Sequence, residues 1–431
     1  MSTLIAPHGN APLKPLLLAR EERNEALNRA RSLKKLPLSS REVSDLFMFA
    51  MGAYSPLAGF MGAADWHGAS VDMRLENGLF WPLPITLSCG EDFAVAVGDD
   101  VALTDAKGEI LGVLAVTEKY AIDKALECRE IYRTTDEAHP GVAKVMAQGP
   151  VNLAGPVSVF SEGHFPETYR GLYLRPAETR ALFAERGWST VAAFQTRNPM
   201  HRSHEFLAKV AIEVCDGLLI HQVLGALKQG DIPADVRVGA IDWLVANHFP
   251  DGRVIQAGYP IEMRYAGPRE ALLHALFRQN FGCSHLVVGR DHAGLGDYYG
   301  PYDAQRIFDE ISADSLAIRP LKIDDTFYCS DCKGMATGNV CFAAEGGEDP
   351  PGEEERYRAV AAVATGDAGG RACRRSDDGK LRISGTRLRE MFANRETIPP
   401  EYSRDGVLAI LQAYYDGAAS FRGGSGPSRT A

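Results

Sequence analysis

Between residues 168 and 288, short apolar runs alternate with longer stretches of helical periodicity. The apolar runs predict strands, and they read STVAAF, GLLIHQVL, RVIQAGY and HLVVG. The stretches that separate them predict helices, and they read HRSHEFLAKVAIEVC, ADVRVGAIDWLVANHF and GPREALLHALFRQNFG. Strands that alternate with helices in this way form right-handed crossovers and a parallel sheet. Ligands bind beyond the carboxyl ends of such strands, so the loops after AAF and after VVG are predicted to carry the chemistry.

Weaker patterns flank this region. Up to about residue 166, WPLPITLSC, FAVAVGDDVALTD and GEILGVLAVTEKY predict strands separated by turn residues, and hence a β-rich domain. After LAIRPLKI, an acidic insertion rich in Gly and Pro near 345–380 precedes LRISGTRLREMFAN and a last helix, RDGVLAILQAYYDG. We therefore expect an α/β protein with three domains and a disordered tail, with the bounds 1–166, 167–322, 323–420 and 421–431.

The composition argues against several classes of protein. The 431 residues carry a net charge of −10, which disfavours broad attraction to nucleic acid or to an anionic membrane. No run reaches the roughly 20 apolar residues that cross a bilayer, and the opening MSTLIAPHGNAPLKP lacks the pattern of a secretory signal. Eight cysteines do not make a disulfide scaffold in a chain of this length, so we expect a reducing, cytoplasmic setting.

The loop after AAF, residues 195–205, reads QTRNPMHRSHE. Pro199 disfavours a helical conformation before it, so the next helix is expected to begin close to His201. His201 and His204 then lie on one face of the first turn, where a helix presents free N–H groups and partial positive charge to a phosphate. Arg197 adds a planar cation suited to a tetrahedral oxyanion. The alternatives are a capping turn with partly exposed imidazoles, or a zinc site that lacks a nearby third ligand.

Several blocks together resemble one family. QTRNPMHRSHE is similar to the signature of the sulfate adenylyltransferases (ATP sulfurylases), whose histidines belong to the wider class of HxGH-type nucleotidyltransferases. GRDHAG at 289–294 resembles the second signature of that family, and ISGTRLR at 383–389 resembles its C-terminal phosphate-facing motif. YSPLAGFM, YRTTDEAHPGV, GDIP and YAGPREA also match segments of the family, and the resemblance covers roughly residues 10–420 in order.

The resemblance implies a fold and a set of roles. It implies a PUA-like N-terminal domain, a Rossmann-like nucleotidyltransferase domain and a small C-terminal domain. The catalytic residues would be Thr196, Arg197, Asn198, His201 and His204. Sulfate would be held by Gln195, Arg197 and the backbone of Ala293. ATP would be held by Gln195, Asn198, His201, His204, Gly289, Arg290, Asp291 and His292. A surface salt bridge with Asp291 is the alternative role for Arg290.

The implied reaction joins sulfate to the AMP part of ATP and releases pyrophosphate. Both substrates are anions, so the protein must offset their repulsion and align a sulfate oxygen in line with the α-phosphorus. His201 and His204 would stabilise the leaving pyrophosphate, and Mg²⁺ would bridge the β- and γ-phosphates. The chain has no GxxxxGK[ST] motif, so we expect the single-function prokaryotic type without an adenylylsulfate kinase domain.

Two other functions stay open at this point. One is a different HxGH-type nucleotidyltransferase, and the other is a non-catalytic RNA-binding protein that uses its PUA-like domain. The excess of acidic over basic residues and the lack of a basic stripe with interleaved aromatic residues weigh against the RNA-binding protein. The partners we expect are ATP and sulfate, with no nucleic acid and no membrane, in a homo-oligomer for which a dimer is favoured.

Three cysteines lie close together in the sequence, at Cys329, Cys332 and Cys341. The C-x2-C spacing with a third nearby thiol suits one tetrahedral zinc ion. Some prokaryotic relatives place a histidine four residues after the third cysteine, where this chain has Glu345. Cys373, a water molecule or no metal at all are the alternatives for a fourth ligand. Four other cysteines, Cys89, Cys128, Cys215 and Cys283, are expected to be small buried residues.

Overall fold

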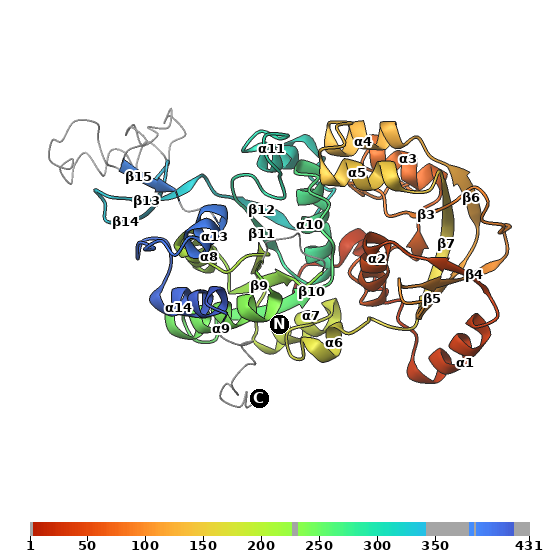
Figure 1. Cartoon of the computed structure of the whole chain (residues 1–431), viewed down its shortest axis with the longest axis horizontal. Coiled ribbons are helices and arrows are strands. Elements are labelled where there is room, and N and C mark those ends of the chain that lie inside the picture. Colours follow the sequence, from red (N-terminus) through yellow and green to blue (C-terminus); the bar gives the residue numbers. More distant parts are fainter. Residues whose placement is uncertain (1–2, 226–231, 342–378, 383–384, 418–431) are drawn as a thin grey trace. The chain divides into compact units, whose positions relative to one another are not determined.

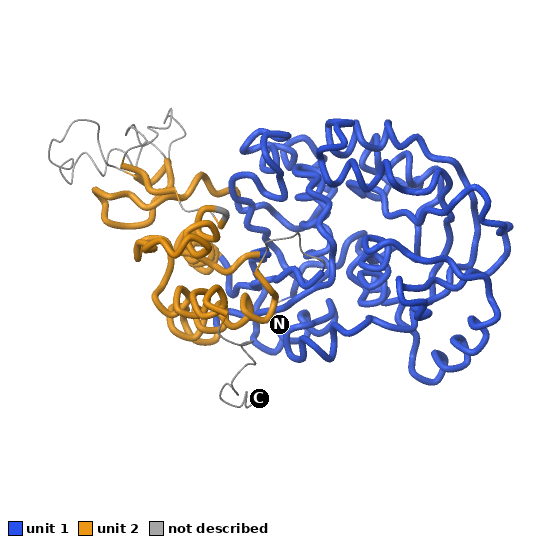
Figure 2. The backbone as a smooth tube through the Cα atoms, viewed as in Figure 1, with its two compact units in different colours: residues 1–197, 215–229, 253–321 blue, residues 198–214, 230–252, 322–431 orange. Residues whose placement is uncertain are grey.

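The computed structural model describes residues 3–225, 232–341, 379–382 and 385–417. The chain divides into two compact units, shown in Figure 2. Unit 1 contains residues 1–197, 215–229 and 253–321, and unit 2 contains residues 198–214, 230–252 and 322–431. The predicted insertion lies almost entirely, and the predicted tail wholly, outside the described residues. No helix in the described ranges is both long and apolar enough to cross a membrane.

The N-terminal part of unit 1 is β-rich, as predicted (Figure 1). Its seven-stranded sheet has the order β1-β4-β5-β7-β2, and β3 and β6 also pair with the long strand β7. The strands are β1 (Lys34–Pro37), β2 (Gly59–Phe60), β3 (Leu87–Cys89), β4 (Asp100–Thr104), β5 (Ile110–Ala115), β6 (Glu118–Ala121) and β7 (Val151–Val159). The helices are α1 (Arg20–Ala30), α2 (Ser40–Ala50), α3 (Ala63–Val71), α4 (Lys124–Tyr132) and α5 (Pro140–Ala147).

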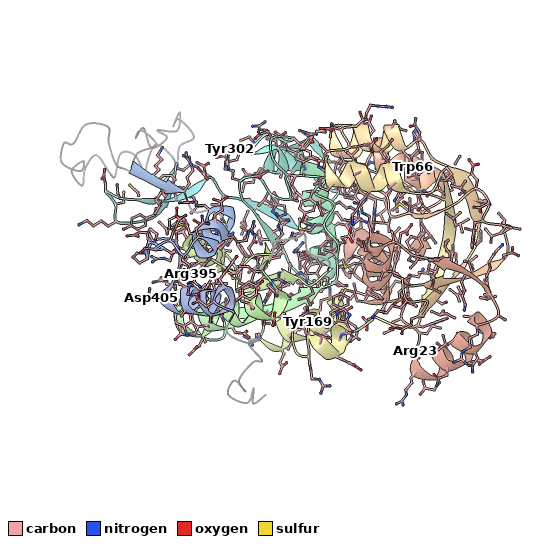
Figure 3. The ribbon with its side chains drawn as sticks, viewed as in Figure 1. Arg23, Trp66, Tyr169, Tyr302, Arg395 and Asp405 are labelled. Atoms are coloured by element: carbon pink, nitrogen blue, oxygen red, sulfur yellow. The ribbon has the colours of Figure 1, made fainter. Side chains whose placement is uncertain are left out.

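Two of the expected N-terminal strands are shorter than predicted. FAVAV at 93–97 forms no strand, and its side chains are half-buried or exposed, so they gain little from pairing. WPLPITLSC contributes only Leu87–Cys89, because Pro82 and Pro84 lack the N–H that a ladder requires. Trp66 of α3, labelled in Figure 3, donates its Nε1 hydrogen to Glu127 of α4 at 2.7 Å, which ties the two helices together.

The second sheet of unit 1 confirms the predicted α/β alternation. Its five strands have the order β10-β9-β8-β11-β12, and β10, β9, β8 and β11 are parallel. They are β8 (Val191–Thr196), β9 (Gly217–Val223), β10 (Val254–Tyr259), β11 (His285–Val288) and β12 (Arg319–Lys322). The chain moves from β8 through β9 to β10 on one side and then places β11 on the other side of β8. The strand order therefore reverses between β8 and β11, which is where open α/β sheets bind ligands.

Helix α10 (Pro268–Asn280) is buried along its whole length, although it carries several charged residues. The other helices of this part are α6 (Phe165–Thr168), α7 (Pro176–Glu185) and α11 (Asp303–Glu310). Arg269 of α10 donates to the carbonyls of Ala69, Ser70 and Pro82, so the helix is bound to the N-terminal part by hydrogen bonds as well as by packing.

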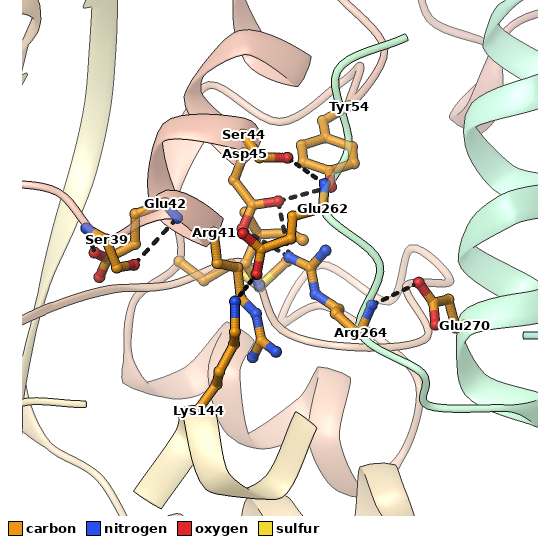
Figure 4. Close-up of polar contacts among 12 residues, drawn as sticks. Ser39, Arg41, Glu42, Ser44, Asp45, Tyr54, Lys144, Glu262, Arg264 and Glu270 are labelled. Atoms are coloured by element: carbon orange, nitrogen blue, oxygen red, sulfur yellow. Dashed lines mark hydrogen bonds and ion pairs between the residues drawn. The ribbon is translucent and has the colours of Figure 1, made fainter. Parts of the chain in front are cut away.

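A buried polar network joins the N-terminal part to the segment before α10 (Figure 4). Arg264 donates from Nη2 to both carboxylate oxygens of Asp45, at 2.8 and 2.6 Å, and Tyr54 donates to the same carboxylate at 2.9 Å. Lys144 pairs with Glu262 nearby. The Asp45 and Arg264 side chains are 2% and 4% exposed, so loss of either partner would leave the other charge buried and uncompensated.

Unit 2 combines two helices from the α/β region with the C-terminal part of the chain. Its helices are α8 (Arg202–Val214), α9 (Ala234–His248), α13 (Gly385–Ala393) and α14 (Asp405–Tyr415). A small sheet has the order β14-β13-β15, formed by β13 (Thr326–Cys329), β14 (Gly334–Thr337) and β15 (Lys380–Arg382). Arg404 donates bidentate hydrogen bonds to the Glu205 carboxylate, at 2.9 and 2.7 Å, which link α14 to α8.

Candidate active site

The loop after β8 begins in unit 1 with two of the predicted sulfate ligands. Gln195 and Thr196 are the last residues of β8, and Arg197 follows directly. Thr196 is buried, while Gln195 and Arg197 are half-buried. The strand thus ends beside the point where the strand order reverses, with one amide and one guanidinium group at its carboxyl end.

Gln195 is held by a buried arginine. Arg278 of α10 donates from Nη2 to Gln195 Oε1 at 2.6 Å and to the Tyr259 hydroxyl at 2.9 Å. A guanidinium group has only donors, so the atom that it contacts must be the amide oxygen. The NH₂ group of Gln195 is consequently turned away from Arg278, and its only described contact is a long one of 3.9 Å to Met263 Sδ.

Arg197 is held by a tyrosine with an unusual backbone. Its Nη1 donates to the Tyr265 hydroxyl at 2.6 Å, and its guanidinium carbon lies 5.0 Å from the centre of the Tyr265 ring. Tyr265 has φ +60°, in the left-handed region that side chains other than glycine rarely adopt. Its carbonyl accepts hydrogen bonds from Tyr299 and His139, both at 3.1 Å, which stabilise this conformation. Strained backbone supported in this way is characteristic of functional sites.

The loop after β11 carries the GRDHAG motif and bends sharply. Asp291 and Ala293 both have φ +56°, and a Cβ at Gly294 would lie 1.9 Å from Asp291 Oδ1. Burial raises the pKa of Asp291, against the charges of Arg290 and Arg197. Arg290 is exposed, and no ion pair joins it to Asp291 in the part of the chain that the structure describes. The structure therefore gives no support to the surface salt bridge that was the alternative for Arg290.

His292, in the same motif, contacts a buried histidine that in turn contacts a buried carboxylate. Its Nε2 lies 3.1 Å from His274 Nδ1, and His274 Nε2 lies 3.4 Å from Glu270 Oε1. Burial raises the pKa of Glu270, but the contact with His274 and the N–H of Arg264 lower it to about 2. Burial lowers the pKa of His274, and burial with the charge of His274 lowers that of His292 to about 3. An ionised Glu270 favours hydrogen on His274 Nε2, so His292 donates from Nε2 to His274 and keeps a lone pair on Nδ1.

The two histidines predicted to face phosphate lie in unit 2. The N–H of Glu205 donates to the His201 carbonyl at 3.0 Å, so the helix begins where the sequence predicted. The two imidazoles stack with centroids 3.7 Å apart. Burial, and then the neighbouring His204, hold the pKa of His201 well below its usual value, and burial lowers the pKa of His204 to about 4. Both rings are therefore neutral at pH 7. His201 is only 5% exposed and His204 is half-buried, so only His204 fits a capping turn with partly exposed imidazoles.

Asn198 is also in unit 2, next to the C-terminal motif. Arg389 of α13 donates from Nη1 to Asn198 Oδ1 at 3.0 Å, and a Cβ added at Gly385 would lie 3.6 Å from the amide carbon of Asn198. The ISGTRLR segment and the loop after β8 thus meet within one unit. Sequence analysis found the segment but assigned no role to Arg389.

Three supporting residues were missed in the sequence: Tyr265, His274 and Arg278. All three lie in or just after YAGPREA, which was matched to the family without any roles. The available signal was the presence of a histidine and an arginine at core positions of the helix that follows.

The three predicted metal ligands come together in the small sheet of unit 2. The sulfur atoms of Cys329, Cys332 and Cys341 all lie within 4.8 Å of one another, and Cys332 Sγ is 3.9 Å from Cys341 Sγ. Glu345 and Cys373, considered as a fourth ligand, lie outside the described residues. Four other thiols, Cys89, Cys128, Cys215 and Cys283, are buried and unpaired by disulfides, as predicted.

A parallel sheet with an amide and a guanidinium group at its reversal point, followed in the sequence by paired histidines at a helix N-terminus, is the arrangement that the sequence predicted for a nucleotidyltransferase. Comparison with known proteins agrees. A family model described as ATP-sulfurylase matches residues 170–414, and one described as PUA-like domain matches residues 5–162. The chain belongs to the ATP sulfurylase family.

Close relatives cover nearly the whole chain. It is 55% identical to a sulfate adenylyltransferase of Chlorobium chlorochromatii, over 96% of this chain and 95% of the relative. It is 54% identical to one of Chlorobaculum tepidum, over 96% of each, and 53% identical to one of Thiobacillus denitrificans, over 97% and 96%. A solved structure titled hexameric APS kinase from Thiobacillus denitrificans matches with a TM-score of 0.66 at 27% identity, over 95% of this chain and 68% of that one. The chain is an enzyme that transfers the AMP part of ATP to sulfate and releases pyrophosphate.

Proposed function

We propose that sulfate is bound by the Gln195 amide, the Arg197 guanidinium and the backbone at Ala293. The observation that carries this proposal is that Gln195 and Arg197 end the same strand and are each held by a separate partner, Arg278 at 2.6 Å and Tyr265 at 2.6 Å. Groups fixed in advance lose little entropy when the anion binds, and they stabilise charge that develops during the reaction.

ATP is assigned to residues of the two loops that follow β8 and β11. On this proposal the phosphates contact Asn198, His201 and His204, and the rest of ATP contacts Gln195, Gly289, Arg290, Asp291 and His292. Neutral His201 offers an N–H donor at the helix N-terminus, and the helix dipole adds partial positive charge. His204 already donates to the Pro199 carbonyl, so it offers a second donor once it is protonated beside the bound phosphates. His292, with a lone pair on Nδ1, suits a hydrogen-bond donor of the ligand, such as a ribose hydroxyl, better than a phosphate oxygen.

The reaction then needs no covalent intermediate. Sulfate held beside Thr196 and Arg197 attacks the α-phosphorus in line, and pyrophosphate leaves toward His201 and His204, which donate hydrogen bonds to it. Arg197 offsets the charge that both anions bring together. Mg²⁺ enters with ATP as part of the substrate and neutralises charge on its β- and γ-phosphates.

The test is pyrophosphate release from ATP and Mg²⁺, measured with sulfate, with the sulfate mimic molybdate, and with neither. We expect release only with an oxyanion present, and AMP as the product with molybdate. Arg197→Ala is expected to abolish release with the fold intact. The matched control is Arg253→Ala, because Arg253 is an exposed arginine at the amino end of β10, bonded to the Asp216 carbonyl. Release without any oxyanion, or normal turnover of Arg197→Ala, would reject the assignment.

Substitution of His204 distinguishes an effect on the catalytic rate from an effect on ATP binding. Because we assign it to the leaving pyrophosphate, His204→Ala should lower the catalytic rate more than it weakens ATP binding. Fluorescence titration with ATP and steady-state rates on the same preparation give the two values. An unchanged rate would restore the interpretation of the two histidines as a simple helix cap.

We also propose that Cys329, Cys332 and Cys341 bind a structural zinc ion. In a tetrahedral site with Zn–S bonds of about 2.3 Å, sulfur atoms are ~3.8 Å apart, and the 3.9 Å between Cys332 and Cys341 fits that spacing. The fourth ligand is then Glu345, Cys373 or water. The ion would brace β13 and β14 and take no part in catalysis, so its removal should lower the melting temperature and leave the chemistry unchanged.

The remaining assignments concern the setting of the enzyme. We propose a cytoplasmic homo-oligomer, with a dimer favoured, that binds neither nucleic acid nor membrane. We retain domain bounds of 1–166, 167–322 and 323–420. The solved relative is called hexameric in its title, so sedimentation of the purified chain must distinguish a dimer from a hexamer.

A further inference from the structure

Arg278 is a cation in the interior of the protein, and no carboxylate of the described residues pairs with it. It is 0% exposed, in the middle of the fully buried helix α10. Its donors reach the His274 carbonyl at 2.9 Å, the Tyr259 hydroxyl and Gln195 Oε1, and its guanidinium lies over the rings of Tyr259 and Phe277. None of the ion pairs in the described ranges involves it. Buried charges are normally paired, so this one calls for a counter-charge from elsewhere.

The titratable groups that face Arg278 supply no negative charge. His221, on the strand next to Gln195, has a pKa well below its usual value, first because of burial and then because of the charge of Arg278. His274 and His292 are neutral for similar reasons. Burial raises the pKa of Cys283 to about 12. Glu270 lies eight residues earlier on the same helix, about 12 Å along its axis, and faces His274 and the N–H groups of Arg264 and Ala266.

Arg278 also determines which way the Gln195 amide points. Because it can only donate, it holds the amide oxygen, and the NH₂ group remains for a ligand at the carboxyl end of β8. If the amide were reversed, it would present an acceptor oxygen, which repels sulfate. Arg278 therefore both orients the Gln195 NH₂ donor and places a positive charge next to the Gln195 amide.

We propose that Arg278 is a positioning and specificity residue for sulfate. It turns the Gln195 NH₂ toward the oxyanion, and the two negative charges of bound sulfate balance the buried positive charge of Arg278. The proposal rests on the assignment of Gln195 to sulfate. It predicts selection for two negative charges as well as for tetrahedral shape.

The experiment compares Arg278→Met and Arg278→Lys with Arg269→Met. Arg269 is a buried arginine of the same helix that donates only to backbone carbonyls of the N-terminal part, so it controls for loss of stability. We expect Arg278→Met to raise the KM for sulfate about 30-fold, with the KM for ATP changed by less than about twofold, since a unit charge acts strongly at short range in a protein interior. Arg278→Lys should recover part of this loss, and Arg269→Met should leave both KM values near those of the wild type.

A charge readout separates specificity from a structural role. Perchlorate is a tetrahedral anion with one negative charge, and its inhibition constant against sulfate is measured in each variant. Arg278→Met should weaken perchlorate several-fold less than it weakens sulfate, because the lost Coulomb energy scales with the charge of the ligand. Equal losses for both anions would mean that Arg278 only maintains the shape of the pocket, and would overturn the proposal.

Gln195→Glu and Gln195→Ala complete the test. Gln195→Glu places a carboxylate next to Arg278, so it should remove sulfate binding and raise the melting temperature by about 2–4 °C; a lower melting temperature would show that Arg278 needs no counter-charge. This readout remains if Arg278→Met fails to fold. An unchanged KM for sulfate in Gln195→Ala would reject the sulfate assignment itself. A raised KM there, with normal values in both Arg278 variants, would reject only the role of Arg278.

Discussion

Removal of one hydroxyl group tests whether Arg197 must be held in place. Tyr265→Phe deletes the oxygen that accepts from Arg197 Nη1 at 2.6 Å and keeps the ring, 5.0 Å from the guanidinium. The Tyr265 carbonyl, which accepts from Tyr299 and His139, is unaffected, so the left-handed backbone is retained. The variant therefore removes this hydrogen bond and keeps the ring contact.

The expected loss follows from the environment of that bond. A hydrogen bond to a charged group contributes about 1.5–3 kcal/mol. Arg197 is only half-buried and keeps its contact with the ring, so the lower end applies. A loss of about 1.5 kcal/mol corresponds to roughly a tenfold fall in kcat/KM for sulfate. The KM for ATP should not change, because Arg197 is assigned to the sulfate side.

The assay is pyrophosphate release with sulfate and ATP varied independently. Tyr298→Phe is the matched control, since the Tyr298 hydroxyl also bonds to a charged group, Asp136 at 2.7 Å, without contacting Arg197. A kcat/KM for sulfate within about twofold of wild type in Tyr265→Phe would refute the reasoning, because the hydrogen bond from Arg197 to Tyr265 would then contribute nothing to the reaction.

Three further changes probe other parts of the molecule. Asp45→Asn leaves Arg264 buried without its partner and should lower the free energy of unfolding in urea by about 3–5 kcal/mol. The double variant Asp45→Asn with Arg264→Met should regain part of that loss of stability. If the free-energy losses of the two single variants simply add in the double variant, the two residues are not energetically coupled. The pKa of His204 is about 4 in the ligand-free protein, and a bound triphosphate raises it, so ATP binding should take up protons and tighten as pH falls from about 8 to 6. Calorimetry in two buffers checks this, and equal proton uptake by His204→Gln would disprove it. Cys332→Ser should reduce the zinc content from about one ion per chain and lower the melting temperature without changing kcat; unchanged zinc by elemental analysis would exclude the site.

The chain's local pattern was sufficient to predict the α/β sheet and the position of the reactive loop. Strands such as Gly217–Val223 are buried throughout, so their sequences are mostly apolar and easy to recognise. Pro199 likewise restricts the backbone before it, which predicted the start of the next helix next to His201. Features of this kind depend on residues that are neighbours in the sequence. FAVAV at 93–97 shows the limit of such patterns, because it has strand composition but no buried face in the structure.

Tertiary structure alone decided how the site is supported. Gln195 and Arg197 meet Arg278 and Tyr265, which are 83 and 68 positions away, and no periodicity relates residues so far apart. The order β10-β9-β8-β11, which places two loops beside the reversal point, depends on strand pairing across the sheet. Charge states were decided in the same way. His201 is a basic residue in the sequence, but burial against His204 keeps it neutral, because the cost of desolvation is set by everything that packs around a side chain.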